Sequence, residues 1–86
     1  MNAVYVYAIP GEKYALVRGH VGGWFRDRRI PAYRSNLHGG WWLRQERVDD
    51  VMARMDVSGL VCRFSDRPAP AYVPPPLDVP AEEAVA

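Results

Sequence analysis

Alternating apolar positions at the start of the chain predict a β-strand. In residues 3–9, small apolar side chains alternate with tyrosine and isoleucine, and a Pro-Gly pair follows. A second short apolar run occupies residues 60–64, directly after a glycine. We therefore expect strands at residues 3–9 and 60–64, which could pair with each other at the edge of the domain.

Between these two apolar runs, the apolar residues of one segment recur with the period of a helix. Val48, Val51, Met52 and Met55 recur at the spacing that places side chains on one face of a helix. A Ser-Gly pair follows and provides a stop signal. We expect a helix over residues 45–55 that packs on the core as ordinary scaffold.

The middle of the chain, residues 18–44, holds all three tryptophans. Val21, Trp24 and Phe25 form an aromatic ridge at helical spacing, which predicts a short helix that ends before the following proline. The chain then reads as a β-hairpin over residues 32–43, with a Gly-Gly pair at its tip. We expect the tryptophans to be core residues, because a domain this small needs their buried area.

Three short motifs in this region and just after it carry a resemblance to a known family. They are Arg-Ile-Pro-Ala at residues 29–32, Gly-Trp-Trp-Leu-Arg at residues 40–44 and Glu-Arg-Val-Asp at residues 46–49. In this order they resemble the second half of excisionase-type and MerR-like winged helix-turn-helix domains, over about residues 18–55. The resemblance implies a small α+β fold with short helices, a β-hairpin wing and a C-terminal helix. It also implies sequence-specific binding of double-stranded DNA.

The approach to this region, IPGEKYALV at residues 9–17, departs from the family pattern, because it shows no acidic-alanine pair. Two interpretations are open. If residues 11–17 are helical, they complete a helix-turn-helix. If they are a strand, residues 4–9 and 14–17 form a hairpin, the helix packs on a small sheet, and nucleic-acid binding rests on a generic basic surface.

Basic residues gather where the resemblance places DNA contacts. Residues 18–34 contain five Arg and one acidic residue, and Arg suits phosphate contacts. A recognition helix would direct Arg18 and His20 toward base edges, while two glycines would let its backbone approach the duplex closely. The expected DNA-binding residues are Arg18, His20, Gly22, Gly23, Arg26, Arg28, Arg29, Tyr33, Arg34, Asn36, His38 and Arg44.

Charge and proline content divide the chain into a body and a tail. Residues 1–67 carry eleven basic and seven acidic residues, a net charge of +4. Residues 68–86 carry three acidic residues, no basic residue and six of the eight prolines. We expect one domain over residues 1–67 and a disordered, proline-rich acidic tail over residues 68–86. The tail is either a solubilising end or a ligand for a partner that recognises polyproline segments.

Catalytic and metal-binding motifs are not evident. Neither histidine has a partner at zinc-ligand spacing, and the chain contains no P-loop and no nucleophile elbow. We therefore expect no enzyme activity, no metal, no cofactor and no small-molecule substrate. No apolar run is long enough for a membrane span, and Cys62, the single cysteine, lies in an apolar run typical of a buried thiol. One free cysteine fits a reducing cytoplasm.

The favoured hypothesis is a cytoplasmic, sequence-specific DNA-binding protein of excisionase type (recombination directionality) or of small transcriptional-regulator type. It would act as copies on adjacent DNA sites or beside an integrase or polymerase. Arginine-rich, lysine-poor usage favours a high-GC bacterium or its phage. The alternative is a non-enzymatic protein-interaction module, such as a phage or accessory protein that binds a host factor through its aromatic patch or proline-rich tail.

Overall fold

The computed structural model describes residues 3–72, which form a five-stranded mixed sheet and two helices, an α+β architecture that is mostly sheet. A short 3-10 turn, η1, leads directly into the second helix. The elements in chain order are β1 (Ala3–Tyr7), β2 (Tyr14–Arg18), α1 (Gly22–Asp27), β3 (Tyr33–Ser35), β4 (Gly40–Arg44), η1 (Gln45–Arg47), α2 (Val48–Val57) and β5 (Val61–Ser65).

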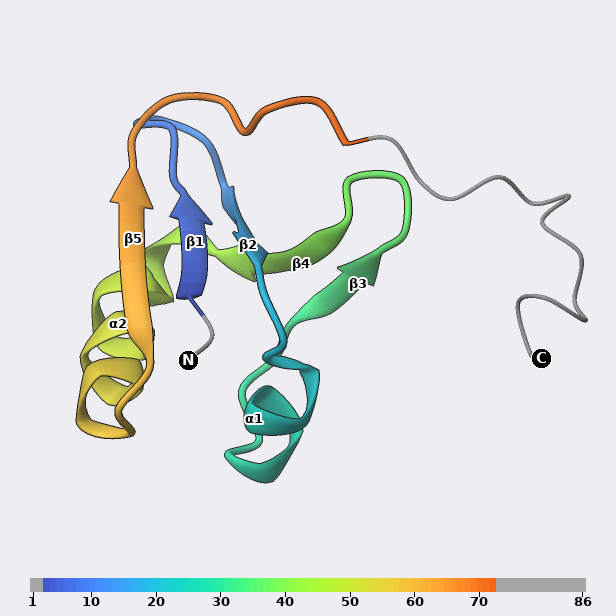
Figure 1. Ribbon diagram of the computed structural model, residues 1–86. Helices are drawn as coiled ribbons and strands as arrows, with labels where there is room; N and C mark the ends of the chain where they lie inside the picture. Colours follow the sequence, from blue (N-terminus) through green and yellow to red (C-terminus); the bar gives the residue numbers. More distant parts are fainter. Residues whose placement is uncertain (1–2, 73–86) are drawn as a thin grey trace, which may run out of the picture.

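The strands are ordered β3-β4-β2-β1-β5 across the sheet, and Figure 1 shows β1 and β5 running in the same direction. All other neighbouring strands are antiparallel. The expected pairing between the first strand and the strand after Gly59 is therefore confirmed. The expectation that both lie at the edge is wrong for β1, because β2 and β5 pair with its two sides.

One face of the sheet is covered by the two helices and forms the core. Successive strand residues point to opposite faces, so every second position is available for this packing. The core joins aliphatic residues of β1, β2 and β4 to one face of α2 and to the residues around α1. Its members include Val4, Val6, Ala15, Val17, Val21, Phe25, Ile30, Leu43, Val48, Val51 and Met55. Burial of each large apolar side chain contributes about 1.5–3 kcal/mol to folding.

The helix expected over residues 45–55 is confirmed, with its first turn in the tighter 3-10 form. Val48, Val51 and Met55 are buried, as the helical period predicts. The opposite face carries the ion pair between Asp50 and Arg54, whose closest N–O distance is 3.3 Å. The helix therefore acts as scaffold, with an apolar face on the sheet and a charged face in solvent.

A winged helix-turn-helix is not confirmed by this fold. Residues 14–18 form β2, so of the two open interpretations of residues 11–17 the structure shows the strand, where a helix-turn-helix needs its first helix. Ala15 and Val17 pack in the core, while Leu16 between them pairs with Trp42 on the other face of the sheet, which is the period of a strand and not of a helix. The observed arrangement is the alternative with a β1–β2 hairpin and a helix packed on a small sheet. The expected hairpin over residues 32–43 is confirmed as β3–β4.

Beyond β5, residues 68–72 run without regular secondary structure toward the tip of the β3–β4 hairpin (Figure 1). The ring of Tyr72 packs against Gly39, where an added Cβ would overlap it. The rest of the predicted disordered tail, residues 73–86, lies outside the described residues.

Candidate functional site

The face of the sheet opposite the helices carries aromatic and basic side chains. These positions alternate with the core positions in each strand and face away from α2. The set, named here the open face, is Tyr5, Tyr7, Tyr14, Leu16, Arg18, Tyr33, Trp42, Arg44 and Arg63. None of the five strands contains Asp or Glu, so the charged side chains that the strands place on this face are all positive.

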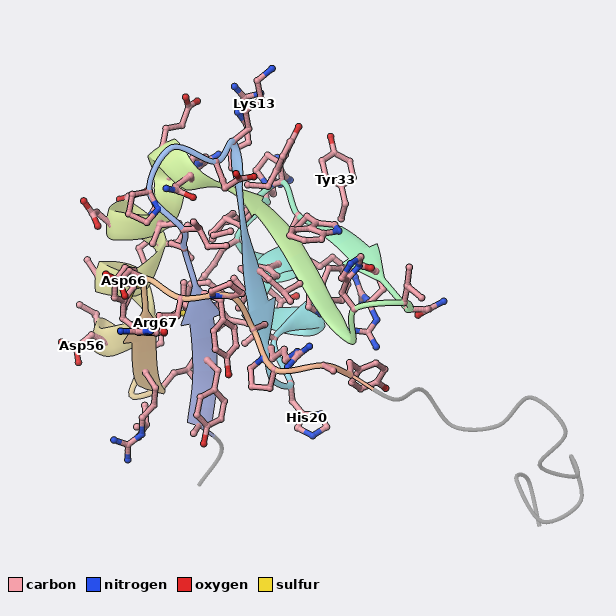
Figure 2. All side chains as sticks on the ribbon, turned by 90° about the horizontal axis from the view of Figure 1, so that it is seen from above. Lys13, His20, Tyr33, Asp56, Asp66 and Arg67 are labelled. Atoms are coloured by element: carbon pink, nitrogen blue, oxygen red, sulfur yellow. The ribbon has the colours of Figure 1, made fainter. Side chains whose placement is uncertain are left out.

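Three aromatic rings of the open face border a shallow cavity of about 570 Å³. Tyr33 of β3 lies opposite Trp42 of β4 in the sheet register, and Tyr14 lies on the adjacent strand β2. The turn between β1 and β2 completes the cavity with Glu12 and Lys13. Figure 2 shows Lys13 and Tyr33 projecting on the same side of the molecule. The cavity therefore combines exposed ring faces with a nearby cation.

Arg18, at the end of β2, is held in place by several contacts. Its guanidinium group donates hydrogen bonds of 3.0 and 3.2 Å to the backbone carbonyl of His38. The same group lies 5.7 Å from the ring centroids of Tyr7 and of Tyr72, within the range of cation–π attraction. Arg18 thus links the sheet, the hairpin tip and the segment after β5.

The tip of the β3–β4 hairpin is ordered by His38. Its Nδ1 lies 2.9 Å from the hydroxyl of Ser35, and its backbone N–H donates to the same oxygen at 3.2 Å. The imidazole also packs edge-on against Trp42, with ring centroids 5.0 Å apart. These contacts fix one end of the open face, while Asn36 is exposed at the tip.

A second basic group surrounds α1, away from the open face. Arg28 lies 4.5 Å from the Trp24 ring centroid and donates a 3.2 Å hydrogen bond to Ser58. Arg34 lies 5.7 Å from the Trp41 ring centroid and donates to the carbonyl of Gly40 at 3.3 Å. These arginines are engaged with the protein itself. The two remaining arginines of the group, Arg26 and Arg29, are exposed.

The glycines at the start of α1 have different surroundings. A Cβ at Gly22 would lie 2.7 Å from the ring of Trp41, whereas a Cβ at Gly23 would meet open space. The close approach of the helix to Trp41 therefore gives Gly22 a packing role within the domain.

The residues predicted to bind DNA are thus divided between two surfaces. Arg18, Tyr33, His38 and Arg44 lie on or beside the open face, and the remaining arginines flank α1. His20 projects on the side opposite to Tyr33 in Figure 2. Sequence reasoning missed most of the aromatic residues of the open face, namely Tyr5, Tyr7, Tyr14 and Trp42. The alternation in residues 3–9 contained the signal for the first two, because a strand places its tyrosines on one face.

The single cysteine lies on the covered side of β5. Burial, together with the negative charge of Asp56, raises the pKa of the Cys62 thiol above its ordinary value of 9.0. Its sulfur lies 3.5 Å from the sulfur of Met55. The neutral thiol is therefore favoured, and Cys62 packs as a small apolar side chain.

The described residues show neither a metal site nor a membrane-spanning helix. Among residues 3–72, no group of three or more His, Cys, Asp and Glu side chains could hold a metal ion. Within the same part of the chain, no helix is long and apolar enough to cross a membrane. The chain matches no protein-family model, no curated protein and no solved structure in three comparisons.

Proposed function

We propose that this protein binds single-stranded nucleic acid across the open face of its sheet. The observation that carries the proposal is the group of solvent-exposed aromatic rings on strands that contain no acidic residue. Unpaired bases stack on such rings, and because every base has a π-face this contact tolerates many sequences. The cavity between Tyr14, Tyr33 and Trp42 includes the most exposed ring of the open face, that of Tyr33, and offers a place for a first base.

The distribution of charge supports the same proposal. Arg44 and Arg63 extend from the open face, and Lys13 borders its cavity. Glu12 borders this cavity and Glu46 pairs with Arg44, whereas Figure 2 shows Asp56 and Asp66 on the side of the molecule away from Tyr33. A phosphate backbone that crosses the open face would therefore meet more cations than carboxylates.

Duplex DNA binding of the excisionase or small-regulator type is the second candidate. A winged helix-turn-helix would read the major groove with a recognition helix, but α1 has six residues and buries Phe25 in the core. The observation that favours duplex binding is the pair of exposed arginines at the end of α1, Arg26 and Arg29. Such a pair suits phosphate contacts, whereas the open face suits splayed bases, so single strands are the better match.

The test is fluorescence anisotropy with a labelled twelve-nucleotide oligo(dT) and, in parallel, a labelled duplex. Replacing Tyr33 with Ala removes an exposed ring, and we expect weaker oligo(dT) binding by about fivefold or more, since one stacked base contributes about 1–3 kcal/mol. Phe64→Ala is the matched control, because Phe64 is 55% exposed against 64% for Tyr33 but lies on the opposite face. Equal losses in the two variants would contradict the proposed surface.

Substitution of two arginines tests whether phosphate contacts contribute to nucleic-acid binding on the open face. Arg44 and Arg54 each form an exposed ion pair with a residue close by in the sequence, Glu46 and Asp50, and have similar side-chain exposures, 57% and 51%. Only Arg44 lies on the open face. We expect Arg44→Ala to reduce the slope of log affinity against log salt by about 0.7, the contribution of one phosphate contact to a single strand. Arg54→Ala should leave that slope unchanged, and a change in both would point to a non-specific field effect.

A further inference from the structure

The proline-rich segment after β5 lies on part of the open face. A groove of about 290 Å³ is lined on one side by residues of β1, β2 and the β3–β4 hairpin, and on the other by the segment itself. The sheet side includes Tyr7, Leu16 and Trp42, and the segment side is formed by residues 68–72. Tyr72 makes the most specific contact, since its ring packs on Gly39 and lies close to Arg18.

This segment is held by side-chain contacts and not by sheet pairing. Proline has no backbone N–H, so Pro68 and Pro70 cannot donate to a neighbouring strand. Among the described residues, the backbone hydrogen bonds outside regular elements include none from residues 68–72. The last hydrogen bond before the segment joins the backbone N–H of Arg67 to the hydroxyl of Ser65. The segment can therefore leave the face without breaking the sheet.

The segment and the proposed ligand need the same side chains. Trp42 and Tyr14 border both the groove under the segment and the open cavity beside it. Tyr72 also supplies an aromatic ring beside the Arg18 guanidinium, a position that a stacked nucleobase would occupy equally well. In addition, residues 68–86 carry a net charge of −3, the same sign as a phosphate backbone.

We propose that residues 68–72 form an intramolecular competitor for the open face, which single-stranded nucleic acid must displace in order to bind. This inference rests on the proposed function. The chain has two states, one with residues 68–72 docked on the open face and one with them displaced. The apparent affinity for nucleic acid is the affinity of the uncovered face multiplied by the fraction of molecules in which the face is uncovered.

The test compares Tyr72→Ala with Tyr72→Phe in the full chain, using the same labelled oligo(dT). Tyr72→Ala removes the ring that packs on Gly39, and we expect the affinity to rise by about threefold or more. Tyr72→Phe keeps the ring and should bind as the wild type does. Equal affinities in all three proteins would show that the segment does not compete, and would leave the proposed function intact.

A second measurement reports the docked segment without any ligand. The Tyr72 ring lies against Gly39, so its ring current should shift the Gly39 NMR signals in the wild type and in Tyr72→Phe, and not in Tyr72→Ala. Saturating oligo(dT) should move the wild-type Gly39 signals toward their positions in Tyr72→Ala. A Gly39 spectrum that is identical in all three proteins would overturn the inference.

The two proposals fail in distinguishable ways. If neither the wild type nor Tyr72→Ala binds oligo(dT), the proposed function is wrong, and so is the proposed competition. The Gly39 signals still establish whether residues 68–72 dock on the open face. If only Tyr72→Ala binds, both proposals are supported.

Discussion

Trp41 and Trp42 are neighbours in β4, yet they belong to different parts of the molecule. Trp41 faces the core side, where its ring packs edge-on against Phe25 with centroids 5.9 Å apart and covers Gly22. Trp42 faces the open side, where it contacts His38 and borders the aromatic cavity. The pleat of the strand sends the two identical side chains to opposite faces. Residue type alone therefore does not reveal which tryptophan stabilises the fold and which is free to bind.

The same division holds for the whole sheet. The buried strand residues of the covered face are valine, alanine and leucine, whose side chains pack closely and contain no polar group that needs a partner. The open face is built from tyrosine, tryptophan and arginine, which have apolar surface and also polar ends that remain in contact with water. One face accounts for folding, and the other is chemically suited to recognition.

The largest expected effect separates the two tryptophans. We expect Trp41→Ala to lower the free energy of unfolding by about 3 kcal/mol, because it empties part of the core. Trp42→Ala should lower it much less and should instead weaken oligo(dT) binding by about 1–3 kcal/mol. Urea denaturation and fluorescence anisotropy measure the two quantities. A loss of stability in Trp42→Ala as large as that in Trp41→Ala would show that the faces are not functionally distinct.

An intermediate effect is expected at the start of α1. Gly22→Ala forces a methyl group against the Trp41 ring, and we expect a loss of about 1–3 kcal/mol in stability from overpacking. Gly23→Ala places its methyl group in open space and should raise stability by up to about 1 kcal/mol, because alanine favours a helix. Thermal denaturation of both variants tests this. If Gly22→Ala proves as stable as Gly23→Ala, the packing role assigned to Gly22 is wrong.

The smallest effect concerns β5, where Cys62 faces the covered side and Arg63 the open side. The pKa of Cys62 is raised in the folded protein, so the unfolded chain loses the thiol proton first as pH rises. The stability from the neutral thiol is therefore complete below pH 9.0 and declines as pH rises through the folded pKa. Cys62→Ala should remove this alkaline decline, as measured by urea denaturation on both sides of pH 9. An unchanged alkaline decline would assign it to other groups.

Most of the regular elements were predictable from local sequence patterns. The alternation in residues 3–9, the period of Val48, Val51 and Met55, and the Gly-Gly tip of the β3–β4 hairpin each act over a few residues. Residues 11–17 were not decided in this way, because their apolar part, residues 14–17, is short enough to fit a strand or a helix. Residues 14–18 form a strand because β1 pairs with one side of it and β4 with the other. A 2.8 Å hydrogen bond from the Gln45 N–H to the carbonyl of Lys13 also holds the start of this strand.

The candidate site was less predictable, because it combines residues far apart along the chain. The basic character of the protein was visible, and Tyr33, His38, Arg18 and Arg44 were selected from the sequence. The strand order, which depends on the whole chain, places these residues apart from the arginines around α1.

By itself, the sequence determined most of the element types, the basic body and the proline-rich segment, since these depend on near neighbours and composition. Only the tertiary structure decided that Trp41 packs against the core and that Trp42 lies on the open face. It also decided that Gly22 is close to a tryptophan ring and that Tyr72 rests on Gly39. The physical reason is that side-chain packing depends on which strands lie side by side, and strand order is a property of the whole chain.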